Sequence, residues 1–535
     1  MASLSPYILT LITFIPLVAA IVVLVIPGKN ERAIKNWAIL VSLIPLALSI
    51  WLAADYYFQY LPSGGGMKYQ VNVEWIPDLN AFYHMGVDGL SIPLIFLTTL
   101  LSTLCLYYSS RTIKKRVKEF FFLFLLLEMG MLGVFMALDY VLFYVFWEIG
   151  LVPMYFLIGI WGQPKDRPRY AAIKFFIYTL VGSVAMMLAI LGLYFQTGTF
   201  DILEVARLQP FANNIVLASL AFWGFMLAFM IKVPSFPFHT WLPDAHVEAP
   251  TAGSVILASV LLKMGTYGFL RFTLPMLPDA TVSFTKPMIA LSIIAIIYGA
   301  YMALAQTDIK KLIAYSSVSH MGFVTLGIFV LNIQGIEGAV MQMVNHGITT
   351  GGLFLCVGII YERTHSRQIQ DNTGLAGPMP RYAIFLMIFA LSSLGLPGTN
   401  SFVGEFLVLA GTFVWSQFAT ALAALGVILA ASYILWLMQR VVFGTPAAAH
   451  RAHLLDLNAR ETATLVPLIV LVFALGIFPN PLLSRMHASV TQLLAGHKAP
   501  AVAVEPPQTP VATDKPTATI AAMLSPSSSE QAAAR

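Results

Sequence analysis

Long, continuously apolar runs follow one another along most of the chain, separated by short polar segments. A membrane-spanning helix needs about 20 apolar residues, whereas a spanning β-strand alternates in polarity over roughly ten. The runs are unbroken, so they predict an all-α polytopic membrane protein and not a barrel. The pattern predicts fourteen spans, at 7–26, 37–54, 90–110, 120–137, 140–161, 171–196, 213–242, 250–274, 287–306, 309–331, 336–361, 381–415, 418–443 and 463–481.

Two of the predicted spans contain helix-breaking sequences in their middle. The seventh runs through KVPSFPFH at 232–239, and the twelfth through GLPGTNS at 395–401. Proline removes a backbone donor and clashes with the preceding turn, so both spans are predicted to be broken helices. They lie five spans apart, which favours two inverted five-helix repeats, spans 4–8 and 9–13, a pattern typical of transporters.

These elements predict a linear domain organisation. Spans 1–3 occupy residues 1–110 with an external loop at 55–89, which shows some β-like alternation at 69–75, and an amphipathic segment is expected at 198–210. The two repeats cover 120–274 and 287–443, and the last span covers 463–481. The tail at 496–535, rich in Ala, Pro, Ser and Thr, is expected to be disordered.

Composition agrees with a membrane solvent. Of 535 residues, 58% are hydrophobic and 10% are charged, whereas a soluble domain has about 25% charged residues. The N-terminus has no basic segment before its apolar run, so 7–26 is expected to be a retained helix. Two cysteines in separate apolar runs, with no CxxC, argue against a redox cofactor in this chain.

The basic residues indicate how the chain is oriented. Loops after odd-numbered spans hold most of the Lys and Arg, whereas loops after even-numbered spans hold only Lys68, Arg207, Arg271 and Lys286 before the tail. The positive-inside rule therefore predicts cytoplasmic odd-numbered loops and both termini on the non-cytoplasmic side. The net charge of +5 follows from these loops and does not indicate nucleic-acid binding.

Several ionisable residues are predicted to lie inside the bilayer, where each charge costs about 2.5–3.5 kcal/mol. They are Glu128, Glu148, Lys232, Lys263 and Glu405, together with the mid-span histidines His320 and His346. One alternative is a set of inert ion pairs that hold helices together. Glu128 alone is almost as easily a packing residue, and His239 is equally an interfacial or a relay residue. Trp161 and Trp241 are expected to be interface anchors.

Proton transfer is the chemistry that such a set permits. A close Glu–Lys pair keeps both groups charged, and separating it changes the proton affinity of the lysine. Lys232, at a predicted break, is expected to be the movable partner of Glu148. A histidine has an ordinary pKa near physiological pH, so a path Glu148, Lys232, Lys263, His320 or His346, Glu405 is predicted along the membrane plane.

The same residues carry a family resemblance. FWEIGLVPM at 146–154, KVPSFPFHTWLPDAHVEAPT at 232–251, Lys263 and DIKKLIAYSSVSH at 308–320 resemble the antiporter-like subunits of proton-pumping NADH:quinone oxidoreductase, respiratory complex I. The resemblance covers about residues 85–445. It implies the fourteen-helix fold with broken helices 7 and 12, and proton-channel roles for Glu148, Lys232, Lys263 and Glu405.

The resemblance also implies a type of subunit and its partners. Members other than the M subunit (chain 4) usually have lysine where this chain has Glu405, and the L subunit has a lateral helix that this chain lacks, which favours the M type. The chain would then be a non-redox subunit of a translocase in a bacterial plasma membrane, beside L-like and N-like subunits. NADH, FMN, iron–sulfur clusters and quinone would belong to partner subunits. The alternative is a subunit of a multisubunit sodium/proton antiporter.

Overall fold

The computed structural model describes residues 7–60, 66–162, 167–445 and 454–495, without the side chains of 59 and 60. The chain divides into a unit at 1–498 and a second unit at 499–535. The second unit and the tail predicted at 496–535 lie outside the described residues.

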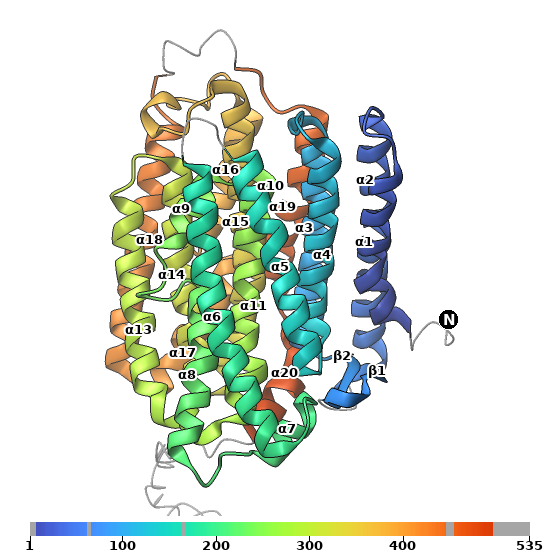
Figure 1. Cartoon of the computed structure of the whole chain (residues 1–535). Coiled ribbons are helices and arrows are strands. Elements are labelled where there is room, and N and C mark those ends of the chain that lie inside the picture. The colour runs from blue at the N-terminus through green and yellow to red at the C-terminus, as the bar shows by residue number, and fades with distance from the viewer. Residues whose placement is uncertain (1–6, 61–65, 163–166, 446–453, 496–535) are drawn as a thin grey trace, which may run out of the picture. The chain divides into compact units, whose positions relative to one another are not determined.

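Helices dominate the first unit (Figure 1). They are α1 (Ile8–Val25), α2 (Glu31–Tyr60), α3 (Ser91–Thr112), α4 (Val117–Met136), α5 (Tyr140–Trp161), α6 (Pro168–Thr197), α7 (Ile202–Leu208), α8 (Ile215–Lys232), α9 (Trp241–Glu248), α10 (Thr251–Ile256), α11 (Leu262–Gly268), α12 (Leu274–Met276), α13 (Pro278–Leu304), α14 (Ile309–Phe329), α15 (Ile333–Thr364), α16 (Pro380–Ser393), α17 (Asn400–Trp415), α18 (Gln417–Val441), α19 (Ala459–Ile477) and α20 (Asn480–Ala495). Strands β1 (Lys68–Ile76) and β2 (Ala81–Val87) form an antiparallel hairpin.

The helices bear out the predicted all-α membrane fold. Within the described residues, thirteen helical stretches are long and apolar enough to cross a membrane, and α16 and α17 are shorter apolar helices. Paired, α16 and α17 form the predicted twelfth span, which completes fourteen. The predicted boundaries were less accurate. Helix α2 begins at Glu31, earlier than the predicted residue 37, because a search for apolar runs passes over its polar first turns. Helix α20 was not predicted, because it is amphipathic and not continuously apolar.

The two ends of the first unit differ in composition. The hairpin, α7 and α20 lie at one end, called here the hairpin end (Figure 1, bottom). The loops that join α1 to α2, α3 to α4 and α13 to α14, and the segment after α15, lie at the other end. This second end is called the basic end because these connections carry most of the loop lysines and arginines.

Side-chain caps fix where several helices begin. Asp139 accepts hydrogen bonds from two backbone N–H groups at the start of α5, and Asp308 does the same at the start of α14. Asn332 caps α15, and Asn458 with Glu461 forms a capping box on α19. Such caps satisfy the otherwise unpaired amides of a first helical turn.

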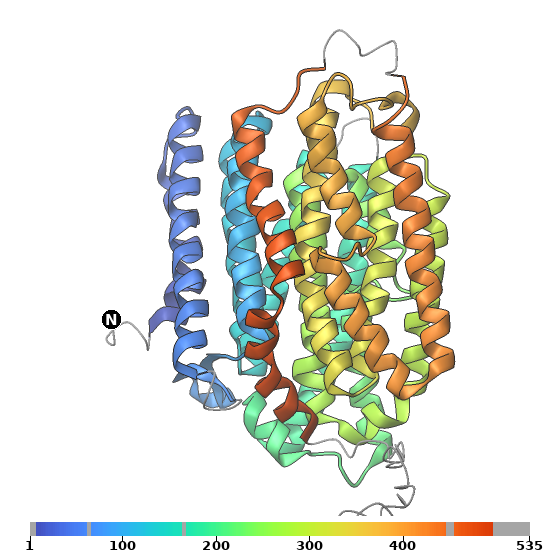
Figure 2. The same ribbon diagram turned by 180° about the vertical axis from the view of Figure 1, so that it is seen from behind.

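The core of the first unit is built from the helices that carry the polar candidates. The stretch Thr251–Met276 and helix α15 are wholly buried in their most apolar windows, whereas α2 and α19 are largely exposed. Helix α13 packs on α14, and α15 packs on α17. Seen from behind, α19 runs past α3 and α15 and the α16–α17 pair (Figure 2). Polar residues on the central helices are therefore shielded from lipid by the outer ones.

Both predicted helix breaks are present. Between α8 and α9 the chain leaves helical geometry, and the indole N–H of Trp241 donates to Ile231 O at 2.9 Å. Trp241 is thus a buried residue of the break, and its predicted interfacial position is wrong. Between α16 and α17, Gly395 and Gly398 have φ values of +80° and +91°, a region in which a Cβ is strained.

The eighth span departs from regular α-helix on both sides of α11. Residues Leu257–Leu261 and Phe269–Thr273 are π-helical. π-Helical turns insert an extra residue and are frequent at functional sites. Lys263 lies between these two turns, on α11.

Candidate functional site

Four buried candidates lie in one connected series. Lys263 Nζ donates to Ala258 O at 2.7 Å and lies 2.7 Å from His346 Nδ1. The rings of His346 and His320 are 6.0 Å apart between centroids. His320 Nδ1 lies 2.8 Å from Glu405 Oε1. Three of these contacts join residues more than 80 positions apart or on different spans, so the fold gathers them from α11, α15, α14 and α17.

The carboxylate of Glu405 is held by two partners. Besides His320, Gln342 Nε2 donates to Oε1 at 2.9 Å. His320 Nε2 faces the hydroxyls of Ser393, at 3.3 Å, and Tyr433, at 3.2 Å. An imidazole that donates through Nδ1 to the carboxylate can accept from these hydroxyls through Nε2. This end of the series is therefore a buried hydrogen-bonded network, in which Gln342 Oε1 has no partner among the described residues.

A polar gap separates the two histidines. It has about 150 Å³ of empty space, is too narrow for a water molecule in this conformation, and is lined by His320, Gln342, His346, Thr349, Thr350, Ser393 and Ser401. His346 Nε2 has no hydrogen-bond partner among the described residues. Side-chain rotation or widening of the gap is required before a proton can pass between the rings.

Glu148 and Lys232 form a looser pair. The two groups attract each other electrostatically, but Lys232 Nζ has no hydrogen-bond partner in the part of the chain that is described. The ammonium instead lies over the rings of Trp147, at 5.1 Å, and Phe175, at 5.9 Å. The predicted pairing is thus a long-range attraction and not a contact in this conformation.

Lys232 nevertheless lies beside the central series. A Cβ placed on Gly265 would lie 3.1 Å from the Lys232 Cβ and 2.8 Å from Phe229 O. Gly265 is two residues from Lys263 on α11, so the end of α8 packs directly against the lysine-bearing turn. The glycine permits this close approach.

Two further candidates lie apart from the series. Glu128 on α4 is fully buried, and neither carboxylate oxygen has a partner among the described residues. Cys105 on α3 is close enough to feel its charge. His239, at the first break, stacks on Phe236 and contacts Tyr298 edge to face. Neither residue connects to Lys263 or Glu405 through a hydrogen bond given by the structure.

Sequence reasoning missed Gln342 and Tyr433, which bond the Glu405–His320 pair. Both are uncharged, and so neither was flagged by a search for expensive charges. A signal existed for Gln342, since it lies four residues before His346, one turn away on the same helix face. Tyr433 gave no comparable signal, because tyrosine is common in membrane helices.

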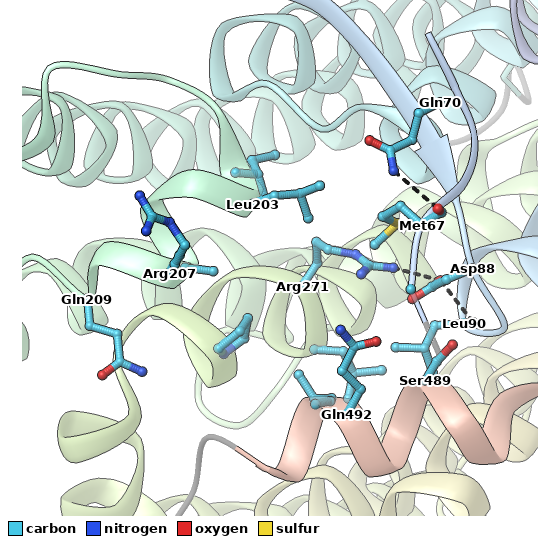
Figure 3. Close-up of a pocket in the computed structure, with 16 residues that line it drawn as sticks. Met67, Gln70, Asp88, Leu90, Leu203, Arg207, Gln209, Arg271, Ser489 and Gln492 are labelled. Atoms are coloured by element: carbon cyan, nitrogen blue, oxygen red, sulfur yellow. Dashed lines mark hydrogen bonds and ion pairs between the residues drawn. The ribbon is translucent and has the colours of Figure 1, made fainter. Parts of the chain in front are cut away.

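A second, larger cavity of about 440 Å³ opens at the hairpin end (Figure 3). Its lining comes from β1, α7, α20 and the π-helical turn Phe269–Thr273. Arg271 points from that turn toward Asp88, and Nη2 donates to Oδ1 at 2.8 Å. Arg271 Nε also donates to the Tyr267 hydroxyl at 3.1 Å. This ion pair closes the inner wall of the cavity.

Neither cavity has the donor set of a metal centre. Within the described residues, no three His, Cys, Asp or Glu side chains are grouped so as to hold a metal ion. The groups gathered in the core are lysine, imidazole, carboxylate and hydroxyl, all of which exchange protons. The arrangement is suited to carrying protons across the plane of the helices.

Known proteins are similar to this chain in sequence and in architecture. Residues 137–431 match a family model described as NADH:quinone oxidoreductase/Mrp antiporter, TM. Subunit M of NADH-quinone oxidoreductase from Rhodobacter capsulatus is 46% identical over 505 residues, which cover 92% of this chain and 97% of that one. The chain belongs to this family.

Two solved structures match the fold of this chain equally well but differ in sequence identity to it. A chain of respiratory complex I from Thermus thermophilus has a TM-score of 0.81 at 31% identity, covering 91% of this chain and 99% of that chain. A chain of the Mrp complex from Dietzia also has a TM-score of 0.81, but at 20% identity, covering 92% and 98%. The second likeness concerns the fold alone, whereas the first extends to the sequence.

Proposed function

We propose that this chain is the M-type proton-translocating membrane-arm subunit of an NADH:quinone oxidoreductase. The observation that carries the proposal is the buried series Lys263, His346, His320 and Glu405, because it connects two charged residues through two imidazoles within the core. Inert ion pairs would not require imidazoles between the charges. The similarity to subunit M of Rhodobacter capsulatus supports the same conclusion.

The contacts define the proton-transfer steps. When Lys263 is an ammonium, it donates to His346 Nδ1; transfer of that proton breaks an Nζ–H bond and forms an Nδ1–H bond. The imidazolium can then release its other proton, from Nε2, toward His320 across the polar gap. His320 in turn donates through Nδ1 to Glu405. Each step moves one positive charge toward the carboxylate, which stabilises it.

Glu148 and Lys232 are suited to begin this series of proton transfers. A buried ammonium is stabilised by a nearby carboxylate and destabilised when that carboxylate is neutralised or withdrawn. Lys232 has no hydrogen-bond partner among the described residues, so a change at Glu148 alters the energy of a proton on Lys232 directly. The proton then favours Lys263, on the adjacent turn.

The energy for this movement must come from outside the chain. Moving one charge against 100 mV costs about 2.3 kcal/mol. We infer that partner subunits carry NADH, FMN, the iron–sulfur clusters and quinone, and that L-like and N-like subunits flank this chain. The chain itself would contribute to a translocase without catalysing the redox reaction.

We further infer the orientation and internal symmetry. The basic end faces the cytoplasm of a bacterium by the positive-inside rule, and the hairpin end and both termini face the opposite side. Spans 4–8 and 9–13 are inverted repeats, within residues 120–274 and 287–443. The breaks that place Lys232 and Glu405 near the core are the corresponding elements of the two repeats.

The test is proton pumping by the complete complex in sealed vesicles. Lys232→Ala and Glu148→Gln are expected to lower pumping at least tenfold, while Lys286→Ala, an exposed lysine, leaves pumping unchanged. Normal pumping by both Lys232→Ala and Glu148→Gln would refute the proposal and favour an inert scaffold. Sodium-driven proton exchange without NADH would favour the antiporter instead.

A further inference from the structure

His246 on α9 is a buried imidazole that the path above does not use. Its side chain is wholly buried, and neither Nδ1 nor Nε2 has a hydrogen-bond partner among the described residues. The ring stacks on Phe354 with centroids 4.6 Å apart and planes 14° apart. An unsatisfied buried polar group costs about 1–3 kcal/mol, so a phenylalanine would fill this place at lower cost. Packing alone therefore does not account for a histidine here.

The charged neighbours of His246 lie on two sides. The charges of Lys263 and Lys310 both interact electrostatically with its ring, and His246 in turn interacts electrostatically with His346. Lys263 and His346 form the first contact of the central series. Lys310 lies in the first turn of α14, at the basic end. His246 therefore lies between the centre of the membrane and its basic end.

One face of α15 leads from the central series to His246. His346, Thr350 and Phe354 are spaced by four residues, so they lie on one face and span about 12 Å along the helix. Thr350 lines the polar gap together with His346. Phe354 is the ring on which His246 stacks. The threonine hydroxyl thus lies between the two imidazoles along this face.

Hydrogen bonds from two cationic side chains hold the segment that follows His246. Lys310 Nζ donates to Ala249 O at 2.6 Å and to Val247 O at 3.4 Å. Arg367 Nη1 donates to Val247 O at 2.7 Å, and Arg367 Nε pairs with Asp308 at 3.2 Å. Glu248, a further carboxylate, belongs to the same turn. These contacts keep Lys310 beside the backbone that carries His246.

We propose that His246 is a proton-carrying residue that connects Lys310 at the basic end with the Lys263–His346 pair. This inference rests on the proposed function. In the step from the basic end, an Nζ–H bond of Lys310 breaks as an N–H bond forms on one nitrogen of His246. The resulting imidazolium then loses the proton of its other nitrogen to Lys263 or His346 in its neutral form. Rotation of the ring, which no hydrogen bond among the described residues holds, brings each nitrogen toward its partner in turn.

The experiment uses the complete complex in vesicles. His246→Gln and His246→Phe are expected to lower pumping at least tenfold, because neither side chain can take up and release a proton as imidazole does. The complex is expected to assemble, since phenylalanine keeps an aromatic ring against Phe354. His246→Ala is expected to regain pumping when imidazole is added, which a purely structural role would not produce. Phe354→Leu, which removes the stack but keeps the imidazole, is expected to pump.

The outcomes separate this inference from the function beneath it. Wild-type pumping by His246→Gln or His246→Phe, or loss in His246→Ala without rescue by imidazole, would overturn the role of His246. If Lys232→Ala and Glu148→Gln lose pumping in the same vesicles, the proposed function survives that result. If those two variants pump normally, the proposed function itself fails.

Discussion

His320 Nδ1 and Glu405 Oε1 are 2.8 Å apart, although 85 positions separate these residues in the chain. The contact joins α14 to α17 directly after the second helix break. It brings a neutral-or-cationic group against a carboxylate in a site where both side chains are almost fully buried. Hydrogen bonds to charged groups are stronger than neutral ones, and more so in a dry interior.

Glu405→Gln tests the charge of this carboxylate. The amide occupies the same space and can still bond to His320, but it neither stabilises an imidazolium nor accepts a proton. A hydrogen bond to a charged group is worth about 1.5–3 kcal/mol, which corresponds to a fall in pumping of roughly ten- to a hundredfold. Proton pumping in vesicles, measured beside NADH-dependent quinone reduction, checks this.

Glu119→Gln is the matched control, because this carboxylate lies in the first turn of α4, where its side chain is 46% exposed and pairs with Arg116 at the surface. It is expected to pump normally. Equal pumping by Glu405→Gln and the control would show that the charge at 405 is dispensable.

The sequence predicted the fold well, and it singled out the candidate residues, because the bilayer makes both apolar spans and buried charges conspicuous. Apolar runs indicate the spans, and a charge such as Lys263 stands out where nearly every neighbour is apolar. Contacts between side chains are harder to predict from the sequence. The bond from Lys263 to Ala258 O depends on a π-helical turn, and Lys232 Nζ lies over the ring of Trp147 and is not hydrogen-bonded to Glu148. His246 lay in a recognised motif, but only its lack of a partner in three dimensions distinguishes it.

Gly265→Ala tests the packing of the lysine-bearing turns. A Cβ at this position would lie 2.7 Å from Val233 Cγ2 and 2.8 Å from Phe229 O. Because the backbone oxygen cannot move independently, the end of α8 must shift, and overpacking of this kind costs about 1–3 kcal/mol. Reduced thermal stability of the purified complex and reduced pumping are expected.

Gly192→Ala serves as the comparison, since a Cβ there meets nothing within 4 Å. This variant is expected to match or slightly exceed the wild type in stability. Identical melting of both variants would contradict the close approach of α8 and α11.

Asp201 makes the attachment of the hairpin dependent on pH. Burial acts to raise the pKa of Asp201, but the hydrogen bond from His84, at 2.6 Å, and backbone N–H groups outweigh it and lower the pKa below its ordinary value. A carboxyl with a lowered pKa stabilises the folded state above its unfolded pKa of about 3.9, and loses that contribution as the pH falls through its folded value. Asp201→Asn is therefore expected to loosen the hairpin by roughly 1–2 kcal/mol at pH 5–8.

Hydrogen–deuterium exchange of the Leu138 amide checks this, because its N–H donates to His84 O on β2 and therefore reports the attachment of the hairpin. The difference between wild type and Asp201→Asn is expected to stay constant from pH 8 to 5 and to shrink as the pH falls below about 4 toward the lowered pKa of Asp201. A difference that grows as the pH falls would have the wrong sign for this mechanism.

Arg271 and Asp88 provide a test of the ion pair at the hairpin-end cavity. Both side chains are nearly buried, at 10% and 5% exposure, and Asp88 Oδ1 also accepts from the N–H groups of Leu90 and Ser91 at the start of α3. Arg271→Met leaves a buried carboxylate without its cation, which costs about 3–5 kcal/mol. Adding Asp88→Asn removes the charge but keeps the amide oxygen that accepts from α3. The double variant is therefore expected to recover at least half of the lost protection of Leu90 and Ser91 in hydrogen exchange. A double variant no more protected than Arg271→Met would show that the arginine acts through packing on Tyr267 and not through Asp88.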